Sequence, residues 1–199
     1  MIISGIAGYG LNELTAPQAM HIIEESHIFY VADTGNHRVM RYFLNATTGD
    51  VVAGGNLCGT NKTQICDPTG LDFDITTNSF TLVDYNLNTI MRWKIGDSKW
   101  VYVAGSVSML TGNSSIELNK PESLAIDPMG NAYVADKSNH RIQFFPINQS
   151  NGMTIAGITA ISGNNATLLS YPCHALVDNQ LNLYVSDTSN GRLQKFLRY

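Results

Sequence analysis

The chain has 199 residues, of which 44% are hydrophobic, so it is long and apolar enough to bury a sizeable core. Only 14% of its residues are charged and its net charge of −4 is mild, which excludes the basic excess expected of a nucleic-acid-binding surface. It has no apolar run of about 18 residues, so we expect no membrane span. Residues 1–10 lack the basic segment of a signal peptide.

A short pattern recurs along the chain at a fixed period. It reads VADTGNHRVMRY from Val31 to Tyr42, and related stretches begin at Leu82, Val134 and Val185. The aspartates of the four copies are spaced by 51, 52 and 51 residues, at Asp33, Asp84, Asp136 and Asp187. A fixed period of this size indicates a repeat architecture.

Two other landmarks recur in the same order. A proline stands 15 or 16 residues before each aspartate, at Pro17, Pro68, Pro121 and Pro172. An Ala-Gly pair follows apolar residues at Ala7-Gly8, Ala53-Gly54, Ala104-Gly105 and Ala156-Gly157. We therefore divide the chain into a single domain of blade-like units, at residues 9–55, 56–105, 106–157 and 158–199, the last completed by a strand over residues 2–8.

The apolar runs within each unit predict strands. In the second unit they are GLDFDI, SFTLVD, TIMRWKI and WVYVAG, each short and rich in β-branched and aromatic residues. Turn formers such as DPMGN at residues 127–131 separate such runs. Four strands per unit at this period predict an all-β fold, a β-propeller of about four four-stranded blades.

The repeated turn, the proline before it and the Ala-Gly pair after it resemble the NHL repeat, a blade type that usually builds six-bladed propellers. The NHRV of residues 36–39 and the NHRI of residues 139–142 are close to the signature of that family. The second unit departs from it, because Leu87 replaces the Asn and Thr89 replaces the Arg, and the fourth has Gly191 in place of His.

The Asp, Asn, His and Arg of the repeated turn look like a catalytic set, but a catalytic set occurs once, whereas this turn recurs in every blade, with the substitutions just named. A buried Asp at a strand end accepts backbone N–H bonds, and Arg pairs with it or with nearby carbonyls. We therefore predict a structural role, which we extend to His37 and His140 although turn histidines are often exposed. The turn residues are Asp33, Asn36, Arg38, Asp84, Asp136, Asn139, Arg141, Asp187, Asn190 and Arg192.

The ends of the chain allow two arrangements. The last unit stops after its third strand, and residues 2–8 resemble the missing fourth. In one arrangement four blades close into a ring through residues 2–8. In the other, which the six-bladed habit of the family favours, the chain is an arc of a larger propeller.

Residues one or two positions after each proline are expected to line the channel of a propeller. They are Gln18, Thr69, Glu122 and His174, and they are candidates for a polar ligand or a metal, although an unspecialised rim explains them as well. Asp72 and Asp74 lie on one face of their strand, which is the pattern of an exposed strand face.

Cysteines and sequons point to an oxidising compartment. Cys58 and Cys66 flank a polar loop and suit a disulfide, whereas Cys173 is expected to be a small buried residue. Asn-x-Ser/Thr sequons fall in predicted loops at Asn45, Asn61, Asn113, Asn148 and Asn165. We expect an extracellular or secreted protein, or otherwise a cytoplasmic one.

Three functions remain open. We favour a non-catalytic scaffold that binds a protein or a glycan, without cofactor, metal or catalytic residues. The resemblance also implies a metal-dependent enzyme, because related propellers include lyases and lactonases with an axial metal. As a third possibility, NHL propellers form the substrate-binding part of longer ubiquitin ligases, although this chain has no paired Cys-x-x-Cys motif. The pattern does not specify an oligomeric state.

Overall fold

The computed structural model describes residues 5–106 and 108–198. The chain divides into two compact units, residues 1–84 with 91–101 and residues 85–90 with 102–199, which are described separately. The described residues contain no α-helix, and therefore no helix that is long and apolar enough to cross a membrane. The predicted all-β class is confirmed.

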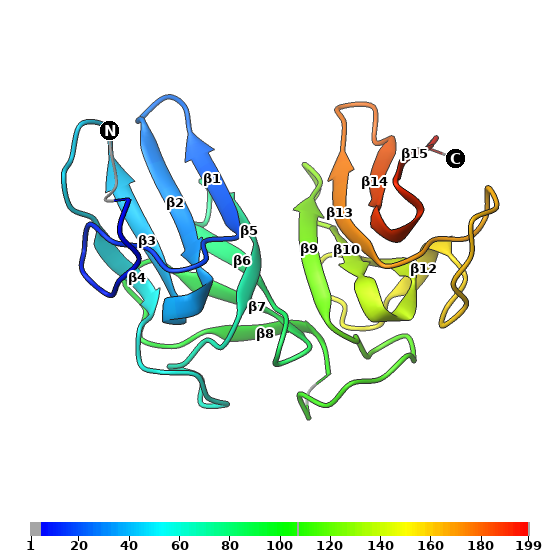
Figure 1. The fold of residues 1–199 in the computed structure, drawn as a ribbon, viewed down its shortest axis with the longest axis horizontal. Coiled ribbons are helices and arrows are strands. Elements are labelled where there is room, and N and C mark those ends of the chain that lie inside the picture. Colours follow the sequence, from blue (N-terminus) through cyan, green and yellow to red (C-terminus); the bar gives the residue numbers. More distant parts are fainter. Residues whose placement is uncertain (1–4, 107, 199) are drawn as a thin grey trace. The chain divides into compact units, whose positions relative to one another are not determined.

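The strands form four antiparallel sheets in chain order, which we number as blades one to four (Figure 1). Three of them have four strands and the described part of the fourth has three. Their bounds are β1 (Ala19–Ile23), β2 (Ile28–Asp33), β3 (Arg38–Phe43) and β4 (Asp50–Gly54); β5 (Pro68–Asp74), β6 (Ser79–Asp84), β7 (Thr89–Lys94) and β8 (Val101–Gly105); β9 (Pro121–Ile126), β10 (Ala132–Asp136), β11 (Arg141–Phe145) and β12 (Met153–Gly157); β13 (Pro172–Val177), β14 (Leu183–Asp187) and β15 (Arg192–Phe196).

In the third and fourth blades, the turn between the first two strands is held by an aspartate. Asp127 accepts backbone N–H bonds from Met129 and Asn131, both at 2.9 Å. Asp178 accepts the equivalent bonds in the fourth blade, and the Asn182 side chain beside it lowers the pKa of its carboxyl. These Asx turns explain why the DPMGN-type segments reverse the chain.

The repeated aspartate ends the second strand of each blade, and in three blades a single 3₁₀ turn follows. These turns are Thr34–Asn36, Lys137–Asn139 and Thr188–Asn190. The next residue has a left-handed backbone, with φ of 56° at His37, 55° at His140 and 60° at Gly191. Glycine suits this conformation best, so the two histidines are held there by the contacts described below.

The Ala7-Gly8 pair does not belong to the series of Ala-Gly pairs that end β4, β8 and β12. Gly8 accepts the Asn36 side-chain amide at 2.7 Å, and Gly112 and Gly163 accept the equivalent amides. Gly8 therefore begins a connecting loop, and Ala7 forms an isolated bridge with Leu14 instead of a strand. Residues 5–8 do not form the expected strand, because the partner of Ala7 lies in the connecting loop that follows. Residues 2–4 of the expected strand lie outside the described residues.

Candidate functional site

The repeated turn is built around a buried aspartate. Arg38 donates from Nε to Asp33 Oδ2 at 2.7 Å, and the Asn36 amide donates to the same oxygen at 2.8 Å. The other oxygen of Asp33 accepts the Thr15 backbone N–H at 2.7 Å. Asp33 and Arg38 are almost wholly buried, so both oxygens and the guanidinium are occupied by protein groups.

The arginine also fastens the connecting loop. The Arg38 guanidinium donates to the carbonyls of Tyr9, Gly10 and Glu13 at 3.0 to 3.1 Å. Each of these donors satisfies a backbone carbonyl that lies in a loop without sheet partners. A single side chain thus holds three points of the loop of residues 8–15.

The same network recurs in the third and fourth blades. Arg141 donates to Asp136 and to the carbonyls of residues 113, 114 and 117, and Arg192 donates to Asp187 and to those of residues 164, 165 and 168. Partial burial raises the pKa of Asp187, but hydrogen bonds from its neighbours outweigh it and lower the value. Because the three arginines bind equivalent partners, each holds its connecting loop in the same way.

The second blade lacks the arginine and holds its loop differently. Asp84 still accepts the backbone N–H of Cys66 at 2.6 Å. The loop of residues 59–66 is closed by a disulfide between Cys58 and Cys66, so that prediction is confirmed. The indole of Trp100 donates to the Gln64 carbonyl at 2.9 Å, the loop position that the arginine serves in the other blades.

The residue with the left-handed backbone reaches the loop of the next blade. His37 Nδ1 contacts the Cys66 carbonyl, so this nitrogen carries a proton and donates it. In contrast, His140 Nδ1 accepts the Tyr171 backbone N–H at 3.2 Å and carries none. Burial lowers the pKa of His140, consistent with a neutral ring. Gly191 has no side chain to make such a contact.

Among the predicted channel residues, Thr69 and Glu122 occupy one repeated position and His174 does not. A bulge follows the proline in the second, third and fourth blades, and in the fourth the register places Pro172 opposite Asp187 and His174 opposite Ser186. Cys173, not the exposed His174, is therefore the counterpart of Glu122, because the prediction took the second residue after Pro172 instead of the first. Gln18 is exposed and Thr69 is buried, and both belong to the other unit.

Glu122 is engaged by a lysine. Its carboxylate pairs with Lys137 Nζ, and both side chains are half-buried. Partial burial lowers the pKa of Lys137, but the hydrogen bond and the charge of Glu122 outweigh it and raise the value. The ring of Tyr85 lies 5.9 Å from the ammonium. Glu122 is thus a carboxylate held in an ion pair.

The aspartates of β5 have separate partners. Asp72 Oδ1 lies 3.2 Å from His21 Nδ1 on β1. Asp74 accepts the Thr77 hydroxyl at 2.7 Å, and this bond lowers the pKa of its carboxyl. Over residues 5–106 and 108–198, no three His, Cys, Asp or Glu side chains come together as a group that could hold a metal ion.

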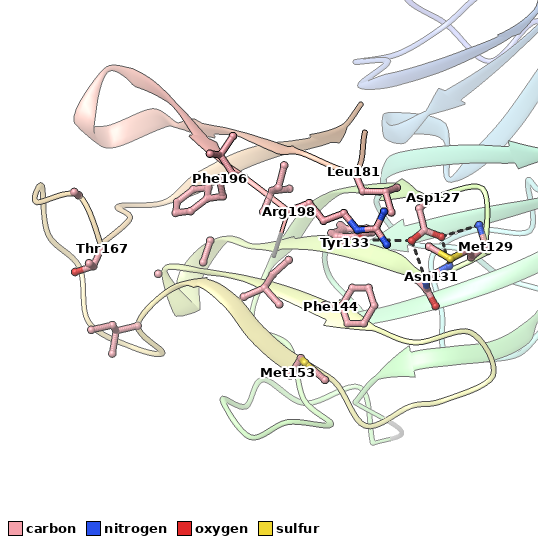
Figure 2. A pocket seen from close by; sticks show the side chains of 17 residues that line it. Asp127, Met129, Asn131, Tyr133, Phe144, Met153, Thr167, Leu181, Phe196 and Arg198 are labelled. Carbon is pink, nitrogen blue, oxygen red and sulfur yellow. Dashed lines mark hydrogen bonds between the residues drawn. The ribbon is translucent and has the colours of Figure 1, made fainter. Parts of the chain in front are cut away.

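The compact unit of residues 85–90 and 102–199 contains a cavity of about 640 Å³ between the third and fourth blades (Figure 2). Figure 2 shows Phe144 and Met153 of the third blade on one side, and Phe196 at the end of β15 on the other. Most of its wall is apolar. At one end, the Tyr133 hydroxyl donates to Asp127 at 3.3 Å, and the positive charge of Arg198 is close enough to act on Tyr133. The cavity therefore has a mostly apolar wall and a small polar region at one end.

Sequence reasoning missed this cavity. The residues that line it come from separate strands and turns of two blades, with Phe144 and Phe196 among them. No local pattern in the sequence therefore indicated the cavity.

The sequon asparagines all lie on the surface. Each of the five has an exposed side chain in a loop, so a glycan would meet no steric obstacle from burial. They are Asn45, Asn61, Asn113, Asn148 and Asn165. Glycosylation at these positions stays a prediction.

Solved structures share this arrangement of blades. A protein of unknown function from Bacteroides thetaiotaomicron matches with a TM-score of 0.72 and 16% identity, over 91% of this chain and 47% of its own. An auxiliary nutrient binding protein from the same organism matches at 0.68 and 17%, over 88% and 46%. A gluconolactonase from Xanthomonas campestris matches at 0.68 and 16%, over 94% and 59%. The chain spans about half the length of these structures, and likeness at this identity establishes the fold alone.

The repeated four-stranded antiparallel sheets, together with these matches, define a protein built of β-propeller blades. Residues 118–145 match the family model described as NHL repeat. This match bears out, within those residues, the resemblance to the NHL repeat that the turn signature predicted.

Proposed function

We propose that the chain is a non-catalytic binding scaffold whose ligand is a protein or a glycan. The observation that carries the proposal is the cavity of about 640 Å³, a size typical of binding sites. Its mostly apolar wall favours a protein ligand, because a sugar requires many polar partners. Two of the matched structures are nutrient binding proteins by name, which supports binding as a use of this scaffold.

An extracellular or secreted location fits this proposal. The Cys58–Cys66 disulfide persists only where thiols are not kept reduced, and the five exposed sequons would accept glycans in the same compartment. Mass spectrometry of the native protein tests this location. Glycan mass at Asn45 or Asn165 is the expected result, and it would rule out the cytoplasmic ubiquitin-ligase alternative.

The binding proposal is tested by selection on the purified oxidised chain. A displayed library of random peptides and a panel of glycans are each screened against it and against the Ile155→Lys variant, which places a charge in the cavity wall. The matched control is Ile75→Lys, which changes an exposed apolar residue of the β5–β6 turn. We expect selected ligands to lose affinity for the first variant only. Equal binding to all three proteins, or no ligand at all, would contradict the proposal.

The enzymatic alternative makes a different prediction. A lactonase or lyase with an axial metal would be stabilised by calcium or zinc and would lose activity with a chelator. Because Glu122 is paired with Lys137 and Asp74 caps a turn, we expect neither metal to raise the melting temperature. A metal-dependent rise together with hydrolysis of a sugar lactone would establish the alternative instead.

A further inference from the structure

The residue with the left-handed backbone in the third blade is joined to the fourth blade through its side chain. His140 Nδ1 accepts the backbone N–H of Tyr171, the residue before Pro172, at 3.2 Å. The two rings also meet edge to face, with their centroids 4.5 Å apart. His140 is buried, so its side of this contact is sheltered from water. A ring nitrogen that accepts a hydrogen bond carries no proton, and the contact therefore requires a neutral histidine.

The second blade makes the same contact without a titratable group. Asn88 stands at the same repeated position, four residues after the aspartate of its turn. Its Oδ1 accepts the backbone N–H of Lys120, the residue before Pro121, at 2.9 Å. Both donor residues have a left-handed backbone, with φ of 52° at Lys120 and 49° at Tyr171. An amide oxygen accepts a hydrogen bond whatever the pH, so only the histidine version of the contact depends on pH.

The first blade has a histidine at this position with the opposite proton requirement. His37 Nδ1 contacts the Cys66 carbonyl, and because a carbonyl only accepts, this nitrogen bears a proton in the contact. The Asp67 carboxylate lies 4.0 Å from the same nitrogen. Protonation of the other ring nitrogen leaves this contact in place and adds an attraction to Asp67. His37 is thus a matched control for His140 within the same chain.

The surroundings of His140 favour its neutral form. The titratable side chains of the fourth-blade segment that packs against its ring are Tyr171, Cys173 and the exposed His174. Over residues 5–106 and 108–198 no ion pair includes His140, and the charged groups of the neighbouring elements are paired with each other: Lys137 with Glu122, Arg141 with Asp136 and Arg192 with Asp187. Burial lowers the pKa of His140. The contact is therefore fully present above the ordinary histidine pKa of about 6.5 and is lost as the pH falls through the lowered folded value.

The His140–Tyr171 contact joins two parts of the cavity wall. The backbone carbonyl of His140 lies so close to Gly157 that a Cβ on this glycine would collide with it, and Gly157 lines the cavity. Tyr171 directly follows the connecting loop of residues 163–170, whose Ala166 and Thr167 also line the cavity (Figure 2). The hydrogen bond between His140 and Tyr171 therefore ties the loop of the fourth blade to the wall that the third blade provides.

We propose that the His140–Tyr171 contact makes binding in the cavity depend on pH, so that an apolar ligand is held at neutral pH and released in acid. Protonation turns the acceptor nitrogen of His140 into a donor that faces the N–H of Tyr171, and the bond between the two blades is lost. The loop of residues 163–170 is then held less firmly against the third blade, and the cavity loses part of its wall. This inference rests on the proposed binding function and gives the regulation of the same site.

The test titrates the full oxidised chain with N-phenyl-1-naphthylamine, an uncharged fluorescent probe of apolar sites, at about pH 7.5 and about pH 5. We expect the probe to bind at neutral pH and to lose about fivefold in affinity in acid, the effect of one hydrogen bond. The His140→Asn variant provides the amide acceptor that Asn88 provides in the second blade, so its affinity should be the same at both pH values. His37→Asn is the control at the equivalent position and should show the same loss in acid as the original protein.

Hydrogen exchange of the Tyr171 amide, measured by NMR and corrected for its intrinsic dependence on pH, follows the contact without a probe. The amide should lose protection in acid in the original protein and keep it in His140→Asn. Unchanged protection in acid, or an equal fall in probe affinity in both proteins, would overturn the proposal. It would also fail if the probe did not bind at neutral pH, or bound Ile155→Lys equally well, because the cavity would then not admit an apolar ligand. Peptides selected from the library that bind equally at both pH values would leave the binding function standing and remove only its regulation.

Discussion

The connecting loops of the first and second blades, residues 8–15 and 59–66, have the same length and end in the same bond. In each, the last residue donates its backbone N–H to the aspartate of the repeated turn. The first loop is held from inside by Arg38, through three carbonyls. The second has Thr89 at that position, and a disulfide closes its ends while Trp100 serves one carbonyl. A covalent bond and an indole thus hold the second loop where a guanidinium holds the first, from which we infer that the turn serves to hold a loop.

The largest effect in this comparison should come from the arginine. In Arg38→Met the buried Asp33 loses its charge partner and the loop loses three donors, so we expect a loss of about 3–5 kcal/mol in the free energy of unfolding, measured in urea. Arg41→Met is the matched control, since its pair with Asp50 is partly exposed and should contribute about 0–1 kcal/mol. Similar losses in both variants would mean that burial of the ion pair does not determine how much the turn contributes to the free energy of unfolding.

The disulfide should matter less than the arginine but more than a single hydrogen bond. Cys58→Ser removes the closure of a short loop, for which chain entropy predicts a loss of about 2–3 kcal/mol. Reducing agent should lower the stability of the original protein by the same amount and leave Cys58→Ser unchanged. An equal effect of reductant on both proteins would show that it acts elsewhere.

Trp100 should contribute a smaller amount. Trp100→Phe keeps most of the apolar volume and removes the indole donor to the Gln64 carbonyl, so we expect a loss of about 1 kcal/mol. Combined with Cys58→Ser, the two losses should differ from their sum, because both changes act on one loop. Strict additivity would indicate that the two groups hold the loop independently.

The histidines of the turn offer the smallest test. Burial lowers the pKa of His140, so its neutral form is favoured in the folded protein. The stability that this provides is fully present above the ordinary pKa of about 6.5 and is lost as the pH falls through the lowered folded value. The His140→Asn variant, which tolerates the left-handed backbone, should lose less stability than the original protein on going from pH 7 to pH 5. Identical pH profiles in thermal melts would refute this role.

The features that repeat along the chain were predicted from the sequence. The period of the repeat located the strands and the turn, and two cysteines flanking one loop predicted the disulfide. The alignment of the repeated units was wrong where one dipeptide occurs in two structural contexts: Ala7-Gly8 begins a loop, whereas Ala53-Gly54 ends a strand. The alignment was also wrong at His174, which stands two residues after its proline, whereas Thr69 and Glu122 stand one residue after theirs.

Other features needed the structure. Trp100 takes the place of Gly49 in the first blade and Gly152 in the third, and this equivalence is visible only when the blades are compared in register. The cavity depends on how the third and fourth blades pack against each other, and no local pattern encodes that.

Hydrogen exchange of the connecting loops, followed by mass spectrometry in oxidised and reduced protein, tests the central claim most directly. The account predicts that reduction accelerates exchange in residues 59–66 and leaves residues 8–15, 112–119 and 163–170 unchanged, because arginines hold those three loops. Faster exchange in all four loops, or in none, would contradict the claim that the disulfide does in the second blade what the arginine does in the others.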